Sequence, residues 1–146
     1  ALSILRAEKG LIIIGKDTDG QTMPHDLGFT APREKKAGEF IGKRGLFTDE
    51  ASRSDRQQLV GLEAVGEPLA AGAHIVRTEG SRRTSQGFVT SSYPSPNLGR
   101  PIALALLRNG RARVGESISV FHLGSTREAR VTLPCAFDPR GERINA

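Results

Sequence analysis

Short apolar runs that recur through residues 57–146 are the feature that most constrains the fold of this chain. Each run is five or six residues long, and turn-forming glycine, proline or serine residues stand between them. Strands of this length with turns between them predict a small antiparallel barrel or sandwich. The runs cover residues 58–63, 73–77, 87–91, 102–107, 117–121 and 128–133.

Residues 1–56 follow a different pattern. Residues 1–14 predict a helix and then a strand-like apolar run, with Gly10 between the two. The sequence Asp-Thr-Asp-Gly at residues 17–20 is typical of a turn, and Thr22 shortly before Pro24 predicts another helix start. Residues 48–56 are polar and predict a linker. We therefore expect an α+β chain that is mostly β.

Composition excludes several kinds of protein. The chain has 146 residues, 37% apolar and 25% charged, as in folded globular proteins. No apolar run approaches the ~18–20 residues that cross a bilayer, and the first residues lack a signal-peptide pattern. We expect a cytoplasmic protein with no membrane partner. A single Cys135 excludes an intrachain disulfide, and Asp17 with Asp19 lacks the other ligands of a calcium loop, so no metal is expected.

Positive charge is concentrated in the last part of the chain. Residues 1–80 contain 11 Lys or Arg and 12 Asp or Glu, whereas residues 81–146 contain 10 Arg, no Lys and 4 Asp or Glu. The net charge thus changes from −1 to +6 between the two parts. Arginine binds carboxylates and phosphates through paired hydrogen bonds. The excess indicates either a solvated face or a surface that binds an anion or another subunit.

Glu8 is the first candidate for a binding residue. It stands in the segment Leu-Arg-Ala-Glu-Lys-Gly at residues 5–10, just before a run of branched aliphatic residues. A carboxylate in such surroundings can accept paired hydrogen bonds from a flat, nitrogen-rich ligand. The alternative is a carboxylate on the exposed face of a helix. Lys35 and Lys36, which precede Glu-Phe-Ile-Gly at residues 39–42, are either ligand contacts or part of a solvated charge run.

Several motifs, in this order and spacing, resemble the folate-binding aminomethyltransferases of the glycine cleavage T-protein class. They include Leu-Arg-Ala-Glu-Lys-Gly at residues 5–10, Gly-Lys-Asp-Thr-Asp-Gly-Gln-Thr-Met-Pro at 15–24, and Val-Thr-Ser at 89–91. Ser-Pro-Asn-Leu-Gly at 95–99 and Ile-Ala-Leu-Ala at 102–105 continue the series. With Phe-Asp-Pro at 137–139, the chain is most similar to the alpha subunits of heterotetrameric sarcosine oxidases within this class.

The resemblance implies a fold and a division of the chain. Residues 1–47 would be the C-terminal strip of a folate-binding α+β domain, residues 48–56 a linker, and residues 57–146 a small antiparallel β-barrel. In this class the glutamate of the first motif contacts the pterin of tetrahydrofolate, which implies that role for Glu8. A basic residue before the Asp-Phe-x-Gly segment also contacts folate, which implies Lys36 first and Lys35 second.

The resemblance also implies a reaction. The parent enzyme would demethylate sarcosine oxidatively to glycine and transfer the one-carbon unit to tetrahydrofolate. FAD, FMN and NAD would bind elsewhere in the parent complex, because this chain has no Gly-x-Gly-x-x-Gly sequence. The catalytic aspartate of the class lies in an upstream part that is not matched here, so we expect the fragment alone to be inactive. Its partners would be the remaining alpha-subunit chain and the other subunits.

Two other functions stay open at this point. One is a stand-alone aminomethyltransferase of glycine cleavage, which shares the same motifs. The other is a basic, folate-related barrel that binds or modifies RNA. Aromatic residues make up only 5% of the chain, which disfavours base stacking, so nucleic acid is an unlikely partner.

Overall fold

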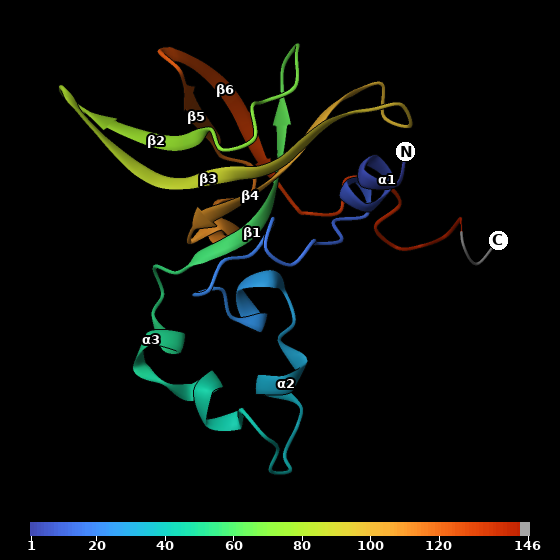
Figure 1. Cartoon of the computed structure of the whole chain (residues 1–146), viewed down its shortest axis with the longest axis vertical. Coiled ribbons are helices and arrows are strands. Elements are labelled where there is room, and N and C mark those ends of the chain that lie inside the picture. The colour runs from blue at the N-terminus through green and yellow to red at the C-terminus, as the bar shows by residue number, and fades with distance from the viewer. Residues whose placement is uncertain (144–146) are drawn as a thin grey trace.

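The computed structural model describes residues 1–143, and short helices occupy the first part of the chain. No helix among these residues is long and apolar enough to cross a membrane. In Figure 1, α1 lies beside the barrel, while α2 and α3 lie below it. The helices are α1 (Leu2–Glu8), α2 (Ala31–Glu34) and α3 (Asp49–Ser52), with the 3-10 helices η1 (Pro24–Leu27), η2 (Lys43–Phe47) and η3 (Gly110–Arg113).

Six strands form a closed barrel in the order β1-β4-β3-β2-β5-β6, and all neighbouring pairs are antiparallel. Each predicted apolar run overlaps one of these strands, so the predicted antiparallel β architecture is confirmed as a barrel. The strands are β1 (Gln57–Ala64), β2 (His74–Glu79), β3 (Arg82–Ser95), β4 (Arg100–Arg108), β5 (Ser117–His122) and β6 (Ser125–Thr132).

Strand β4 is apolar on both faces because it separates two cores. Ala103 and Ala105 face the barrel interior, where they pack with buried residues of the other strands. Ile102, Leu104 and Leu106 alternate with them and belong to a second core on the outside of the barrel. A strand that is covered on both faces has no need of alternating polar residues, which accounts for the continuous run in its sequence.

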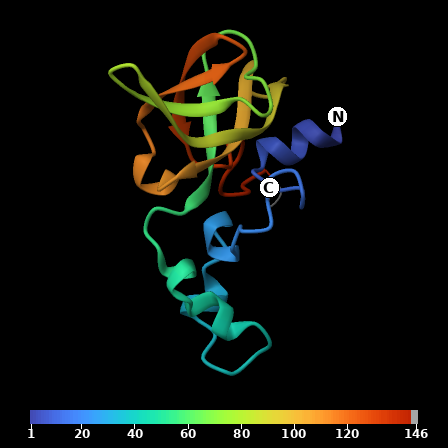
Figure 2. The ribbon, with the colours of Figure 1, turned by 60° about the vertical axis from the view of Figure 1, so that its left-hand side comes forward.

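The second core joins the N-terminal strip (residues 1–47) to the barrel. Ala7 of α1 is 2% exposed and packs with Leu59 of β1 and the outward residues of β4. Ile12 and Leu27, which are partly buried, pack against the same cluster. The first part of the strip therefore packs against an outer face of the barrel, while the part with α2 extends away from it (Figures 1 and 2).

The strand-like run predicted before residue 15 does not form a strand, and this prediction is wrong. Residues 11–13 have no regular structure, and Ile13 and Ile14 are 42% and 79% exposed. A closed barrel has no free lateral edge beside α1 to pair with another strand. The N–H of Ile13 instead donates to the carboxylate of Asp17 at 2.9 Å.

Gly87 provides a test of the close approach between β3 and β4. A Cβ atom at this position would overlap the carbonyl oxygen of Leu106 and lie 2.9 Å from Cα of Leu107. Gly87→Ala should lower the free energy of unfolding by about 3 kcal/mol, because backbone atoms cannot repack as side chains do. Urea denaturation measures the change. Gly38→Ala is the control, since nothing lies within 4 Å of a Cβ there; equal losses in both variants would contradict the constraint.

Candidate functional site

Glu8 lies at the end of α1 and is 1% exposed. Ser95 Oγ donates to one carboxylate oxygen, and Asn97 Nδ2 donates to the other at 2.7 Å. The backbone carbonyl of Glu8 also accepts the N–H groups of Ala136 and Phe137, both at 2.9 Å. Glu8 therefore connects three segments that are far apart in sequence: α1, the β3–β4 turn and the chain after β6.

A second buried carboxylate, Asp17, lies beside Arg6. The two side chains form an ion pair and are 0% and 11% exposed. Arg6 Nη2 donates to Ser91 Oγ at 2.7 Å, and the hydroxyls of Thr90 and Ser91 both donate to Asp17 Oδ1. The pairing and the hydrogen bonds offset most of the cost of burying these charges, although Arg6 Nε is buried without a hydrogen-bond partner among the described residues.

The barrel contributes to both contacts mainly through alternate residues of β3, and Thr90, at the β-bulge beside Ser91, adds a hydrogen bond to Asp17. Ser91, Tyr93 and Ser95 lie on one face of that strand, as a two-residue period requires. Ser91 meets Arg6 and Asp17, while Ser95 meets Glu8. The two motifs of the strip and the Val-Thr-Ser … Ser-Pro motif of the barrel are therefore halves of one polar interface. We call Arg6, Glu8, Asp17, Ser91 and Ser95 the anchoring cluster.

The chain after β6 closes the interface from the other side. Lys9 Nζ pairs with the carboxylate of Asp138 at 2.9 Å and also donates to its backbone carbonyl at 2.7 Å. Gly10 has φ +70°, and a Cβ atom there would lie 2.8 Å from the carbonyl carbon of Pro134. The glycine at the end of the first motif therefore permits a left-handed turn and a close backbone approach.

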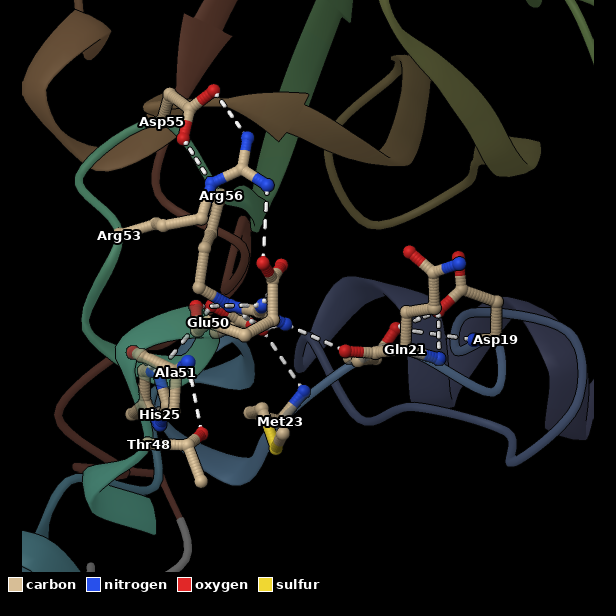
Figure 3. A network of polar contacts seen from close by, with 12 residues as sticks. Asp19, Gln21, Met23, His25, Thr48, Glu50, Ala51, Arg53, Asp55 and Arg56 are labelled. Carbon is tan, nitrogen blue, oxygen red and sulfur yellow. Dashed lines mark hydrogen bonds and ion pairs between the residues drawn. The ribbon is translucent and has the colours of Figure 1, made fainter. Parts of the chain in front are cut away.

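Arg56 connects the strip to β1. Its Nε donates to both carboxylate oxygens of Asp26, at 3.1 and 3.0 Å, and its Nη1 donates to Glu50 Oε1 at 2.9 Å. Its Nη2 donates to the carbonyl of Gln21 and to Asp26. Figure 3 shows Arg56 between Glu50 and Gln21, together with the Arg53–Asp55 pair beside them. The segment predicted as a linker thus contains a helix, α3, and a fully engaged arginine.

The predicted folate contacts do not come together in this structure. Lys35 and Lys36 are exposed and follow α2, and Lys36 Nζ lies 4.5 Å from the centre of the Phe40 ring. Glu8 lies on α1 against the barrel, whereas α2 lies at the far end of the strip in both ribbon views (Figures 1 and 2). Glu8 and the two lysines therefore belong to different surfaces of the part that is described.

Sequence reasoning missed most of the anchoring cluster. It interpreted Asp17 as a turn residue, and it gave Arg6 and the serines of β3 no role. The signal was present in the order of the motifs, since Asp17 and Ser91 both lie in quoted motifs. Spacing along the chain cannot show that residues 74 positions apart are in contact, as Ser91 Oγ and Asp17 are.

Apolar side chains are exposed along the free face of α1 and the loop after it. Leu2 and Leu5 are 82% and 51% exposed, and Leu11 and Ile14 are 61% and 79% exposed.

Comparison with known families identifies the barrel. Residues 57–138 match the family model described as the glycine cleavage T-protein C-terminal barrel domain. That match covers more than half of the chain, so the chain belongs to this family, as the motifs predicted. The strip lies outside the matched residues.

Relatives extend the match into the strip. The chain is 42% identical to a sarcosine oxidase subunit alpha of Corynebacterium sp. (strain P-1), over 97% of this chain and 15% of the relative. It is 34% identical to the mitochondrial aminomethyltransferase of Gallus gallus, over 80% of this chain and 29% of the relative. The chain therefore spans about 15% of the length of the sarcosine oxidase relative.

A solved structure has the same fold. The crystal structure of glycine cleavage system aminomethyltransferase T from Bartonella henselae superposes with a TM-score of 0.75 over 94% of this chain and 38% of that chain. The identity is 24%, so this similarity supports the fold alone.

The environment of Asp17 changes the acidity of its carboxyl group. Burial acts to raise the pKa, whereas hydrogen bonds from Thr90, the Ile13 N–H and Ser91 act to lower it. The charge of Arg6 also lowers it, and the pKa of Asp17 falls below its ordinary value of 3.8. A lowered pKa in the folded state stabilises the fold above the pKa of the unfolded chain. This stability is lost as the pH falls through the folded pKa.

Asp17→Asn should lower the free energy of unfolding by about 3–5 kcal/mol at pH 7, because Arg6 is left as an unpaired buried charge. Asparagine does not titrate, so the difference from the unsubstituted protein should narrow between about pH 5 and pH 3. Urea denaturation across this range measures both effects. The exposed Asp49 gives the control variant Asp49→Asn. Parallel stability curves for Asp17→Asn and the unsubstituted protein would contradict the role given to the charge.

Proposed function

We propose that this chain is the C-terminal part of a sarcosine oxidase alpha subunit. The carrying observation is the 42% identity over 97% of the chain, because it includes the strip as well as the family barrel. The whole enzyme would demethylate sarcosine oxidatively to glycine and transfer the one-carbon unit to tetrahydrofolate. The region described would help to bind folate, and it would be inactive without the rest of the protein.

The proposed division of the chain is residues 1–47 for the strip of the folate-binding domain, 48–56 for the linker and 57–146 for the barrel. Exposed leucines on α1 support it, because the rest of a larger domain would cover them. The remaining alpha-subunit chain and the other subunits are the proposed partners. FAD, FMN and NAD would bind elsewhere in that complex, and a cytoplasmic location belongs to the same proposal.

Glu8 is the proposed contact for the pterin ring. Its carboxylate is held in one orientation by Ser95 and Asn97, and each oxygen keeps a further lone pair. Asn97 is exposed, and its amide donates to Glu8 Oε2 as the amino group of a pterin would. In the proposed complex the ligand would replace the Asn97 amide, and the amino group of the pterin would donate to this oxygen in its place. Glu8 would orient folate rather than transfer a proton.

Lys36, with Lys35 as the second choice, is the proposed basic folate contact. Both side chains are exposed and follow α2, which lies apart from α1 in Figure 1. In the proposed enzyme, the rest of the folate-binding domain would complete the pocket that joins the lysines to Glu8. The lysines would contact an acidic part of the ligand, as an ammonium group does.

A stand-alone aminomethyltransferase is the second candidate, supported by the 34% identity to the Gallus gallus enzyme. The complete reading frame separates the two functions. A Gly-x-Gly-x-x-Gly sequence after a predicted strand upstream would indicate the oxidase, and an upstream part without it would indicate the aminomethyltransferase.

Calorimetric titration of the full-length protein with tetrahydrofolate tests the role of Glu8. Glu8→Gln should weaken binding about tenfold or more, because a charge-assisted hydrogen bond is lost. Asn97→Ala should leave the affinity unchanged or raise it, since the ligand replaces that amide. Unchanged affinity in Glu8→Gln, together with a lower unfolding temperature, would restrict Glu8 to anchoring α1.

The same titration decides between the two lysines. Lys36→Gln should weaken folate binding about three- to tenfold, and Lys35→Gln should have a smaller effect, as expected for one exposed charged contact. Arg44→Gln is the matched control, because it removes one exposed positive charge from the same strip. An equal loss in all three variants would show a general charge effect instead of a specific contact.

A further inference from the structure

The barrel has a seam at which strand pairing stops before the strands end. β2 and β5 are joined by three residue pairs, the last of which is Val76–Ser119. β2 continues to Glu79, and β5 begins at Ser117. Within the described residues, no pairing joins residues 77–79 to the start of β5. Each strand still pairs with its other neighbour there, β2 with β3 and β5 with β6. Two free strand edges therefore face each other.

A groove of about 820 Å³ fills this opening. Residues 76–78 of β2 form one wall, and residues 117–119 of β5 form the other. Ile118 is 5% exposed and belongs to the core of the barrel interior. Both ribbon views show the β2–β3 hairpin extending away from the barrel (Figures 1 and 2). The groove is thus an opening between two strands, and its polar atoms include backbone groups of both edges.

Positive charge surrounds the groove. Arg77, Arg108 and Arg113 line it, against the acidic residues Asp55 and Glu116. Both acids are already engaged: Arg113 forms two hydrogen bonds of 2.8 Å with Glu116, and Arg53 pairs with Asp55 at 2.8 Å. The groove walls carry three arginines against two acids, so an excess of positive charge remains at Arg77 and Arg108.

The hairpin turn adds further positive charge. Arg82 and Arg83 are exposed, and the Arg83 guanidinium lies 4.8 Å from the centre of the Phe121 ring on β5. Glu79 pairs with Arg77 at 2.9 Å, but both side chains are more than two-thirds exposed. Exposed pairs of this kind are weak. Strand edges beside an excess of arginine favour an extended, acidic ligand.

We propose that an extended acidic segment of a companion subunit binds in this groove as an added strand. Its backbone would pair with the free edge of β2, and its carboxylates would contact Arg77 and Arg108. Strand addition of this kind obtains affinity from main-chain hydrogen bonds and specificity from alternate side chains. The proposal rests on the proposed membership of a multi-subunit enzyme, and it concerns a surface away from the anchoring cluster.

A second copy of this chain is a poor occupant. Pairing two β2 edges would bring Arg77 of one copy close to Arg77 of the other, with Arg82 and Arg83 of β3 beside each edge. Like charges that face each other across strands are destabilising. The groove therefore requires a partner of opposite charge.

A synthetic peptide tests the groove directly. The probe has about eight residues that alternate glutamate with threonine, the length of an ordinary strand, and fluorescence anisotropy measures its binding to the full-length protein. Binding should saturate and should weaken with salt. A peptide with N-methyl groups on alternate residues cannot pair along one edge, and a peptide with lysine in place of glutamate has the wrong charge. Both should bind at least about tenfold more weakly.

Paired variants locate the binding surface. Arg77→Gln with Arg108→Gln should weaken binding of the glutamate peptide about three- to tenfold. Arg44→Gln with Arg140→Gln removes two exposed positive charges outside the groove walls and should change the affinity by less than about twofold. Equal effects of both pairs, or equal binding of the N-methylated peptide, would overturn the proposal. So would a single-stranded RNA that binds the groove more tightly than the peptide.

Assembly with the companion subunits provides a further test of the groove. Co-purification of the companion subunits with the full-length protein should decrease in the Arg77–Arg108 double variant and in the presence of excess glutamate peptide. Intact assembly in both cases would overturn the proposal and leave the folate titrations unaffected. Loss of folate binding with normal peptide binding would instead count against the proposed function alone.

Discussion

The buried pair of Arg6 and Asp17 determines how the two parts of this chain fit together. Neither charge could remain buried without the hydroxyls of β3, since Thr90 and Ser91 complete the shell of the carboxylate. A buried ion pair adds little net stability over apolar packing, but breaking it is costly. Its effect is to permit one alignment of the strip on the barrel, in which Glu8 meets Ser95 and Lys9 meets Asp138.

The barrel could be predicted from sequence because its signals are local. Each strand appears as a short apolar run in the sequence, and the structure explains the continuous run of β4 by its burial on both faces. The strip could not be predicted in the same way. The apolar run before residue 15 has the composition of a strand, but an isolated segment cannot show whether a free edge exists to pair with it. Its outcome was decided by the closed barrel and by the carboxylate of Asp17.

In the candidate site, too, local sequence patterns could not show which distant residues come into contact. The sequence indicated Glu8 as a candidate binding residue. In the structure its carboxylate is buried and accepts a hydrogen bond at each oxygen. The partners of Glu8 lie 87 and 89 residues away, so no local pattern could name them. The motifs nevertheless contained both halves of the interface. Recognising the motifs located the important residues, while only the three-dimensional arrangement showed that they contact each other.

The second core has a consequence for how the family barrel is defined. The matched residues begin at 57, where the first strand begins, yet the outward faces of Leu59, Leu104 and Leu106 are covered by residues of the strip. A barrel that began at residue 57 would lack these contacts. The three leucines would then be exposed to water as an apolar patch on the outside of the barrel. The family match and the second core therefore have different boundaries, and we expect the barrel to unfold together with the segment that precedes it.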